Sequence, residues 1–340
     1  MTAMIRIFLA LVLLLVPAAA GLAQTDPPLC GGNNLLDELR KKDAAKAESV
    51  LQEAGATPNH DSLIWKVEPA SGEAASWLVG TAHVTDGRLS GLASRLNERI
   101  TSASVAVFEL EEVADKNRMM VKSFLQARFM AMPPGQSLWD IVPDDKEAAI
   151  RNHPSLAGGQ ADAVFAYQPW VVVTMLSMPM CEMQRQLAGL PSFDERLARI
   201  AVDAGVPVKG LETLEEQLSI MSGIALEDQA KQLVAVAELG GYSEDLLQTL
   251  VDLYLDSKVT AFMPLAKVLW PEFEAGEFAR IGREIEQGLI LKRNHIMAER
   301  ARAHIDAGNA FIAVGALHLP GKEGVVELLR QAGYKVTKAE

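Results

Sequence analysis

The chain has 340 residues, of which 49% are hydrophobic and 22% are charged, and it contains two cysteines. This composition excludes a disordered polymer, a collagen-like fibre and a disulfide-dense mini-protein. The formal net charge is −12. It disfavours binding to nucleic acid or to an anionic membrane surface, because both carry charge of the same sign.

Residues 1–23 have the pattern of a secretory signal peptide. Arg6 precedes an apolar run over residues 7–16, and small residues follow Pro17. This run is about half of the roughly 20 residues that a membrane-spanning helix needs. We therefore expect cleavage before Gln24, or else after the alanines at 18–20, and export to a bacterial periplasm or out of the cell. No later segment is apolar enough to be expected to span a membrane.

Cys30 and Cys181 are the only cysteines. In an oxidising compartment they could form one disulfide, which would tie the N-terminal arm to the body of the protein. The alternative is that they are unrelated, with one buried and the other exposed. The sequence leaves both possibilities open.

Hydrophobic periodicity and turn residues predict a chain in which strands lie at both ends and helices between them. The expected elements, in chain order, are a helix over 35–51, a hairpin of strands 63–67 and 76–79, a helix over 89–100, a buried strand over 104–110, a mostly helical, methionine-rich stretch over 115–190, a helix over 194–204, a strand over 206–211, long amphipathic helices over 212–305, a strand over 310–314, a helix over 323–331 and a strand over 334–336. We therefore expect one α/β domain over residues 30–338. Its N- and C-terminal halves share a central mixed sheet, and a large helical insert lies between them.

Two histidines occupy equivalent positions after apolar strands. His83 ends the sequence Gly80-Thr-Ala-His, and His318 ends Gly315-Ala-Leu-His. Glycine lets the chain turn sharply as it leaves a strand. Each histidine is therefore expected just beyond the carboxyl end of its strand, where α/β sheets place their sites. The histidines without this context are expected at the surface: His60, His153, His295 and His304.

Glu109 is the third candidate, near the end of the buried strand over 104–110. A carboxylate in such a position is costly unless it is paired or binds a metal ion. With two neutral imidazoles it could bind zinc, manganese or cobalt. Alternatively, Glu109 pairs with Arg293 and the histidines serve in turns. Glu111 is expected to share the strand face of Glu109, because side chains alternate between faces, but to lie further out.

These motifs resemble those of the TraB/GumN family, whose animal members include the Tiki metalloproteases. The resemblance runs from about residue 30 to the C-terminus and rests on the order of several short motifs. They are Cys30-Gly31, Gly80-Thr-Ala-His83, Val-Phe-Glu109-Leu-Glu, Gln168-Pro-Trp170, Asp194, Gly210-Leu-Glu212-Thr213 with Gln217, Arg293-Asn294, and Gly315-Ala-Leu-His318-Leu-Pro-Gly. The resemblance implies that two Gly-x-x-His motifs and a glutamate form the active site. In this sequence these are His83, His318 and Glu109.

Three further residues are weaker candidates. Arg293 could clamp a carboxylate or an oxyanion, or it could be a solvated helix residue. Glu212 and Asp194 could each orient a histidine or act as a general base. Asp194 could instead cap the helix that follows Pro191-Ser192.

The sequence thus predicts an exported, metal-dependent hydrolase, with a peptidase as the first choice. His83, Glu109 and His318 would bind one divalent ion (Zn, Mn or Co), Glu111 or Glu212 would accept a proton, and Arg293 would stabilise an oxyanion. The expected partner is a peptide or small-molecule substrate. The alternative is a non-catalytic periplasmic protein that binds a ligand or a glycan. Its link to polysaccharide biosynthesis is implied only by the family name.

Overall fold

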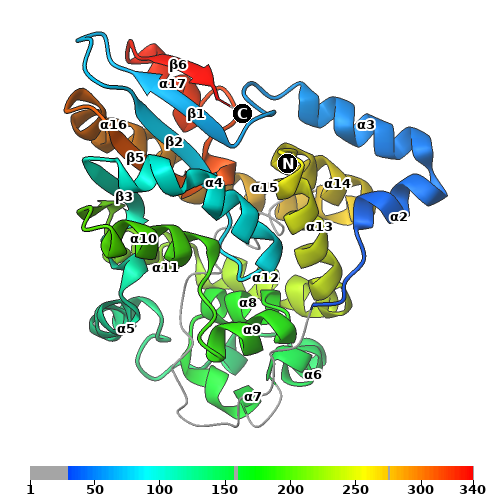
Figure 1. Ribbon diagram of the computed structural model, residues 1–340. Coiled ribbons are helices and arrows are strands. Elements are labelled where there is room, and N and C mark those ends of the chain that lie inside the picture. The colour runs from blue at the N-terminus through cyan, green and yellow to red at the C-terminus, as the bar shows by residue number, and fades with distance from the viewer. Residues whose placement is uncertain (1–29, 157–159, 275, 340) are drawn as a thin grey trace.

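The computed structural model describes residues 30–156, 160–274 and 276–339 (Figure 1). Its centre is one six-stranded mixed sheet with the order β4-β3-β5-β2-β1-β6. The strands are β1 (Ile64–Glu68), β2 (Ser76–Thr81), β3 (Val105–Leu110), β4 (Val208–Glu212), β5 (Ala310–Gly315) and β6 (Lys335–Lys338). Adjacent pairs among β4, β3, β5 and β2 are parallel, whereas β1 runs antiparallel to both β2 and β6. The N- and C-terminal parts of the chain therefore share one sheet, as the sequence predicts.

Helices surround this sheet and fill the rest of the described chain. The α-helices are α2 (Leu35–Lys42), α3 (Ala44–Gly55), α4 (Ser90–Thr101), α5 (Lys116–Leu125), α6 (Asp144–Arg151), α7 (Gln160–Ala163), α8 (Pro169–Ser177), α9 (Met180–Leu187), α10 (Phe193–Asp203), α11 (Leu214–Ser222), α12 (Leu226–Glu238), α13 (Ser243–Leu255), α14 (Phe262–Leu269), α15 (Gly276–Ile285), α16 (Arg293–Asp306) and α17 (Val325–Gln331). A π-helical stretch, η10 (Glu286–Lys292), joins α15 to α16. No helix in the described part of the chain is both long and apolar enough to cross a membrane.

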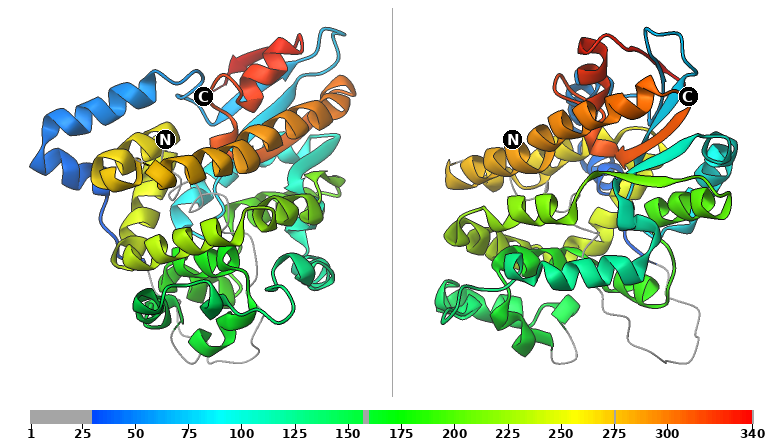
Figure 2. Two further views of the ribbon diagram at one scale, coloured as in Figure 1. Left: turned by 180° about the vertical axis from the view of Figure 1, so that it is seen from behind. Right: turned by 90° about the vertical axis from the view of Figure 1, so that its left-hand side faces the viewer.

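The sheet is the middle of three layers. On one face, α4 and α10 pack their apolar sides against β2, β3 and β5. On this face Phe108 of β3 contacts Phe311 of β5. On the other face, α16 and α17 bury Met297, Ile305 and Val326 against the same strands. Figure 2 shows α16 lying across the back of the sheet. Because both faces are covered, β3 and β5 are almost continuously apolar, which is typical of central parallel strands.

The helical insert has a hydrophobic core of its own. Residues from α8, α12, α14 and α15 form one cluster with Trp170 and Phe262 at its centre, and α2 and α3 pack against it. Figure 1 shows these helices gathered at the carboxyl ends of the central parallel strands. The insert therefore covers the edge of the sheet at which the candidate residues lie.

Cys30 and Cys181 form a disulfide, so the alternative of two unrelated cysteines is wrong. The bond joins the start of the described chain to α9. The residues that follow Cys30 lie along α13, where the backbone N–H of Asn33 donates to Asp245 and that of Leu35 donates to Thr249. The N-terminal arm is thus fixed to two helices of the insert. The predicted signal segment, 1–23, lies outside the described residues.

Three local predictions were wrong. The helix expected over 35–51 is two helices, because Asp43 leaves the helical conformation and its side chain accepts the backbone N–H of Lys46 to start α3. The long helices expected over 212–305 are several shorter ones, of which α16 has 14 residues. His153, expected at the surface, is only 4% exposed, because its ring packs against Gly240.

Candidate active site

The parallel strands bring the predicted residues to one edge of the sheet. The register aligns Thr81 with Gly315 and Leu110 with Glu212. His83 follows β2, His318 lies in the turn η11 (Ala316–His318) after β5, and Glu109 and Glu212 lie at the ends of β3 and β4. Since β4, β3, β5 and β2 are neighbours in this order, all four side chains come from consecutive strand ends.

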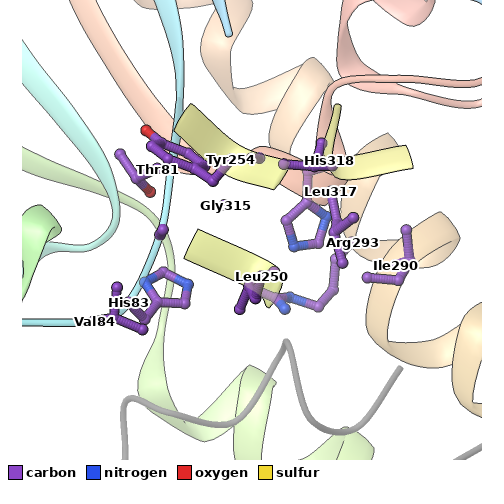
Figure 3. A pocket seen from close by; sticks show the side chains of 13 residues that line it. Thr81, His83, Val84, Leu250, Tyr254, Ile290, Arg293, Gly315, Leu317 and His318 are labelled. Carbon is purple, nitrogen blue, oxygen red and sulfur yellow. The ribbon is translucent and has the colours of Figure 1, made fainter. Parts of the chain in front are cut away.

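The two histidines face each other across a pocket in Figure 3. This hollow has a volume of about 580 Å³, part of which is open to solvent. Its polar lining includes His83, His318 and Arg293, and the remainder is largely apolar: Val84, Leu250, Tyr254, Val259, Ile290 and Leu317. The pocket therefore presents a few polar groups in an apolar wall, which is the usual composition of a ligand site.

Each histidine is held through its Nδ1 atom. His83 Nδ1 lies 2.8 Å from Asp194 Oδ2, and His318 Nδ1 lies 2.6 Å from Asn294 Oδ1. Asn294 itself donates from Nδ2 to the carbonyl of Glu323, so its oxygen faces His318. Both Nδ1 atoms are therefore the donors, and each Nε2 atom is left to face the pocket.

Asp194 thus orients a histidine, which is one of the roles that the sequence suggested. Its other oxygen accepts from the hydroxyl of Thr81. The alternative role was wrong, because Ser192 is the residue that caps α10.

Glu109 is 6% exposed, and both of its oxygens are held. Oε1 accepts the backbone N–H of Gly315 at 2.7 Å, and Oε2 accepts from Arg293 Nη2 at 2.8 Å. His318 Nε2 lies 3.9 Å from Oε1. The carboxylate therefore lies between a guanidinium and an imidazole, at the point where β3 and β5 adjoin.

Arg293 connects two carboxylates beneath the pocket. Its Nε and Nη2 atoms donate to Glu212 at 2.7–3.0 Å, and Nη2 also donates to Glu109. The residue is 3% exposed, so the interpretation of Arg293 as a solvated helix residue is wrong. Gln217 adds a donor to this group, with Nε2 at 3.2 Å from Glu212 Oε2. The pairing of Glu109 with Arg293, which the sequence left open, is thus present.

Burial and neighbouring charges together shift the pKa values of His83, His318 and Glu109. Burial lowers the pKa of His83, but the charge and hydrogen bond of Asp194, helped by Glu109, outweigh this effect and raise the pKa to about 9. Burial and the charge of Arg293 lower the pKa of His318 to about 3, against the opposite effect of Glu109. Burial raises the pKa of Glu109, but Arg293 and the two histidines hold it well below its usual range. With no metal ion bound, these shifts favour a protonated ring at His83 and a neutral ring at His318, so an ion that binds His83 Nε2 would displace the proton there.

Glu111 does not reach this pocket. The strand ends at Leu110, and a 3-10 helix, η2 (Glu111–Ala114), begins at Glu111. The alternation expected for a continuing strand therefore stops there, and the expectation that Glu111 shares the face of Glu109 is wrong. Glu111 instead forms an ion pair with Arg118 at 3.0 Å, and its side chain is 35% exposed.

Tyr254 is a lining residue that the sequence gave no reason to select. It lies in α13, where its spacing is that of an ordinary core position. Its hydroxyl donates to the carbonyl of Gly80 at 2.7 Å, and its ring packs edge-to-face on Phe193. It therefore supports the turn that leads from β2 to His83. The location of Tyr254 beside the pocket follows from the packing of α13 over the strand ends, which the sequence does not show.

The fit of the site to a divalent ion can be judged from its donors. Among the described residues, no three His, Cys, Asp or Glu side chains are already gathered as a metal site. The chemistry nevertheless suits a cation: two Nε2 atoms are free, and each Nδ1 atom has the carboxylate or amide partner that supports a metal-binding imidazole. Three buried carboxylates, Glu109, Asp194 and Glu212, lie with a single buried guanidinium.

Gly315 keeps space open between these donors. A Cβ atom there would lie 3.2 Å from Glu109 Oε1, 3.4 Å from His83 Nε2 and 3.4 Å from His318 Cδ2. The three side chains thus surround one point, and a side chain at position 315 would occupy it. The donor types present, two imidazoles and a carboxylate, therefore fit a small cation, although the His318 atom beside this point is the carbon Cδ2.

Comparison with known proteins identifies the family of this chain. The model of the TraB/PrgY/gumN family matches residues 63–338. Metalloprotease TIKI2 of Danio rerio is 24% identical over 319 residues, covering 81% of this chain and 60% of the relative. Metalloprotease TIKI1 of Homo sapiens is 21% identical over 323 residues, covering 82% and 62%. The chain thus spans roughly three fifths of the length of these curated relatives. No solved structure matches it. Since the family model covers most of the chain, including every strand of the sheet, this protein belongs to the TraB/PrgY/gumN family.

Proposed function

We propose that this protein is an exported, metal-dependent hydrolase that cleaves peptides. The observation that carries the proposal is the arrangement of His83 Nε2, His318 and Glu109 Oε1 around the space at Gly315. The names of the relatives, which are metalloproteases, support the same class of reaction. Export rests on the signal-like residues 1–23 and is supported by the disulfide, since such bonds persist in oxidising compartments.

His83, His318 and Glu109 would hold the ion. A divalent ion bound there would act as a Lewis acid that polarises a carbonyl group and lowers the pKa of water. Asp194 and Asn294 keep the two imidazoles in the tautomer that presents Nε2. Arg293 fixes Glu109 so that Oε1 points toward Gly315. These residues would thus hold the ligand set in place before the substrate enters.

Arg293 would have a second role toward the substrate. Its contacts with Glu109, Glu212 and the carbonyl of Leu289 engage four of its five N–H donors among the described residues. One Nη1 proton therefore remains for an oxyanion formed in the pocket. Of the two carboxylates suggested as proton acceptors, we propose Glu212, because both of its oxygens contact Arg293, which lines the pocket, whereas Glu111 pairs with Arg118 away from it.

The apolar wall suggests which peptides would bind. Leu250, Ile290 and Leu317 line the pocket beside the two histidines (Figure 3). A substrate with an apolar side chain next to the scissile bond would bury that side chain against them. We therefore expect cleavage beside apolar residues rather than charged ones.

Elemental analysis of the full chain, purified without chelator, tests the proposal. We expect about one equivalent of zinc, manganese or cobalt, which is lost in the double variant His83→Ala/His318→Ala. His304→Ala is the matched control, because His304 lies on α16 about three turns from Arg293, and it should retain the metal. A peptide library then reports cleavage and its sequence preference.

Two outcomes would contradict the proposal. Metal retained in the double variant would show that the ion is held elsewhere. Absence of metal from the unaltered chain, even after the ion is added back, would favour the alternative of a ligand- or glycan-binding protein with the same fold.

A further inference from the structure

Helix α5 presents its apolar side to solvent. Among the described residues, ten large hydrophobic side chains are exposed, and four of them lie within six positions of this helix. They are Met120 (53% exposed), Val121 (55%), Phe124 (79%) and Leu125 (69%). Their spacing of three and four residues places them on one side of a helix. This is the reverse of an ordinary surface helix, which turns its apolar side inward.

The opposite side of α5 faces the protein through polar contacts. Ser123 is buried, and Glu112, which is 2% exposed in η2, forms ion pairs with Lys122 and Arg118. Figure 1 shows α5 at the margin of the molecule, beyond the end of β3. The helix is therefore attached by these ion pairs and by Met119, which packs on the core of the insert, and no element of the described chain covers its exposed apolar side.

Basic residues surround the apolar side. From Lys116 to Trp139 the sequence contains four basic residues and no acidic one, although the whole chain has a net charge of −12. At 100° per residue, Lys116 falls along one border of the apolar side and Arg118 and Lys122 fall along the other. Arg128 follows just beyond the helix and is 66% exposed. An apolar strip bordered by cations is the pattern of a helix that lies in a membrane interface.

These cations also contact carboxylates on the body of the protein. The pairs are Lys116–Glu195, Arg118–Glu111, Lys122–Glu112 and Arg128–Glu215. The four basic side chains remain 40–66% exposed. The pairs of Arg118 with Glu111 and of Arg128 with Glu215 are exposed on both sides and contribute little to stability, whereas Lys122 pairs with the buried Glu112 and stays with it. Long side chains can therefore turn toward lipid phosphates while their carboxylate partners stay behind the helix.

The size of the apolar strip favours a bilayer over a second protein chain. Four such side chains expose on the order of 400 Å², which is the size of a functional surface patch. A stable protein complex buries about 800 Å² on each partner, roughly twice as much. A bilayer needs no matching surface, because inserted side chains are surrounded by acyl chains.

We propose that α5 docks this protein on the surface of a phospholipid bilayer. Phe124 and Leu125 enter the boundary between headgroups and acyl chains, and the bordering basic residues lie at the level of the phosphates. The helix begins seven residues after Glu109, so docking would place the carboxyl edge of the sheet near the membrane. The overall negative charge does not oppose this, because the charge along residues 116–139 has the opposite sign.

A tryptophan reporter in the full chain tests the proposal at α5 itself. Phe124→Trp should show blue-shifted emission, and quenching by brominated lipid, when phosphatidylcholine–phosphatidylglycerol vesicles are added. Val202→Trp on α10 is the matched control, since Val202 is 54% exposed, and it should not respond. Phe124→Glu/Leu125→Glu should weaken vesicle binding by at least about tenfold, whereas Val202→Glu should not. Circular dichroism confirms that each variant is folded.

Other outcomes would contradict the proposal or one of its parts. Equal responses of the two tryptophans, or vesicle binding that survives Phe124→Glu/Leu125→Glu, would overturn it. Binding that did not increase with the phosphatidylglycerol content would overturn the role of the basic residues. A concentration-dependent dimer that the double variant abolishes, without vesicle binding, would identify a second copy of the chain as the occupant.

Discussion

At the scale of single residues, the candidate site depends on charges that are buried together. Arg293 holds Glu109 and Glu212 at hydrogen-bond distance, and all three are almost fully buried. A buried ion pair is weak evidence for added stability, but the removal of one partner leaves an uncompensated charge in the interior. A substitution of Arg293 would therefore change both the stability of the fold and the positions of the two carboxylates in the site.

Arg293→Met should for this reason be strongly destabilising. Without the guanidinium, two buried carboxylates face each other, and we expect the free energy of unfolding to fall by about 3–5 kcal/mol. Urea denaturation followed by circular dichroism measures the change. Arg302→Met on the same helix is the control, because Arg302 is 44% exposed and its ion pair with Glu299 lies at the surface. This variant should cost less than about 0.5 kcal/mol. Equal losses in both variants would contradict this account of the buried cluster.

Gly315→Ala tests the space between the two histidines. The backbone there has φ −53°, which alanine adopts readily, so the fold should persist. The new Cβ would lie 3.2–3.4 Å from Glu109 and both imidazoles, and we expect metal affinity to fall by at least about tenfold. Gly91→Ala in α4 has no atom near the new Cβ and should leave the affinity unchanged. An unaltered affinity in Gly315→Ala would mean that the ion does not occupy this space.

At the scale of elements, helix caps hold the site-bearing strands in position. Helix α11 begins two residues after Glu212, and its first turn is closed by Thr213 and Glu216 in a reciprocal capping box. Arg300 from α16 donates to both oxygens of Glu216 at 2.6 and 2.8 Å. This contact connects the end of β4 to the helix that carries Arg293.

Glu216→Gln should weaken this connection in a pH-dependent way. The hydrogen bonds of Arg300 are the main cause that lowers the pKa of Glu216 from 4.5 to about 2. Because the folded-state pKa is depressed, the stabilisation is present above about pH 4.5 and is lost as the pH falls toward 2. We expect the variant to lose up to about 1 kcal/mol at pH 7, since Glu216 is a third exposed, and almost nothing near pH 2. Thermal unfolding at several pH values measures this.

The control for this prediction is Glu227→Gln. Glu227 lies in the first turn of α12, one position closer to the helix start than Glu216 is in α11, and it is exposed and has no contact with Arg300. Its effect should be small at every pH. A loss in Glu216→Gln that stayed constant between pH 7 and pH 2 would contradict the assignment to the ion pair.

At the scale of the whole molecule, the disulfide joins parts of the chain that are far apart in sequence. Cys30 and Cys181 are separated by 151 residues, and the bond connects the N-terminal arm to the insert. Closing so long a loop removes much conformational entropy from the unfolded chain. Neither cysteine lies in a strand of the sheet. The bond therefore holds the N-terminal arm against the insert and acts on the strands only indirectly.

Cys30→Ser/Cys181→Ser should therefore lower the free energy of unfolding by about 2–5 kcal/mol. Urea denaturation with and without reductant measures the difference. Reductant should destabilise the unaltered chain and should have no further effect on the double variant. Identical unfolding of the two proteins without reductant would show that the bond contributes nothing.

Much of this architecture could be predicted from the sequence. Apolar runs such as residues 104–110 and 310–314 identify the central strands, because a strand buried on both faces has no polar alternation. Gly-x-x-His after two such strands places both histidines at strand ends. The two failures have different causes. At Asp43 a local side-chain cap, which the hydrophobic period does not reveal, divides one helix into two, whereas His153 is buried by a tertiary contact with Gly240.

The sequence by itself therefore determined the class of fold, the position of His83, His318 and Glu109 at strand ends, and the family that these motifs resemble. These features follow from hydrophobic pattern and turn chemistry, which act between neighbouring residues. Only the tertiary structure decided which side chains meet, since Asp194 holds His83 across 111 positions and Arg293 reaches Glu109 across 184. Strand order and register set those contacts, and the exposed side of α5 is defined by the same packing, because burial is a property of the folded chain.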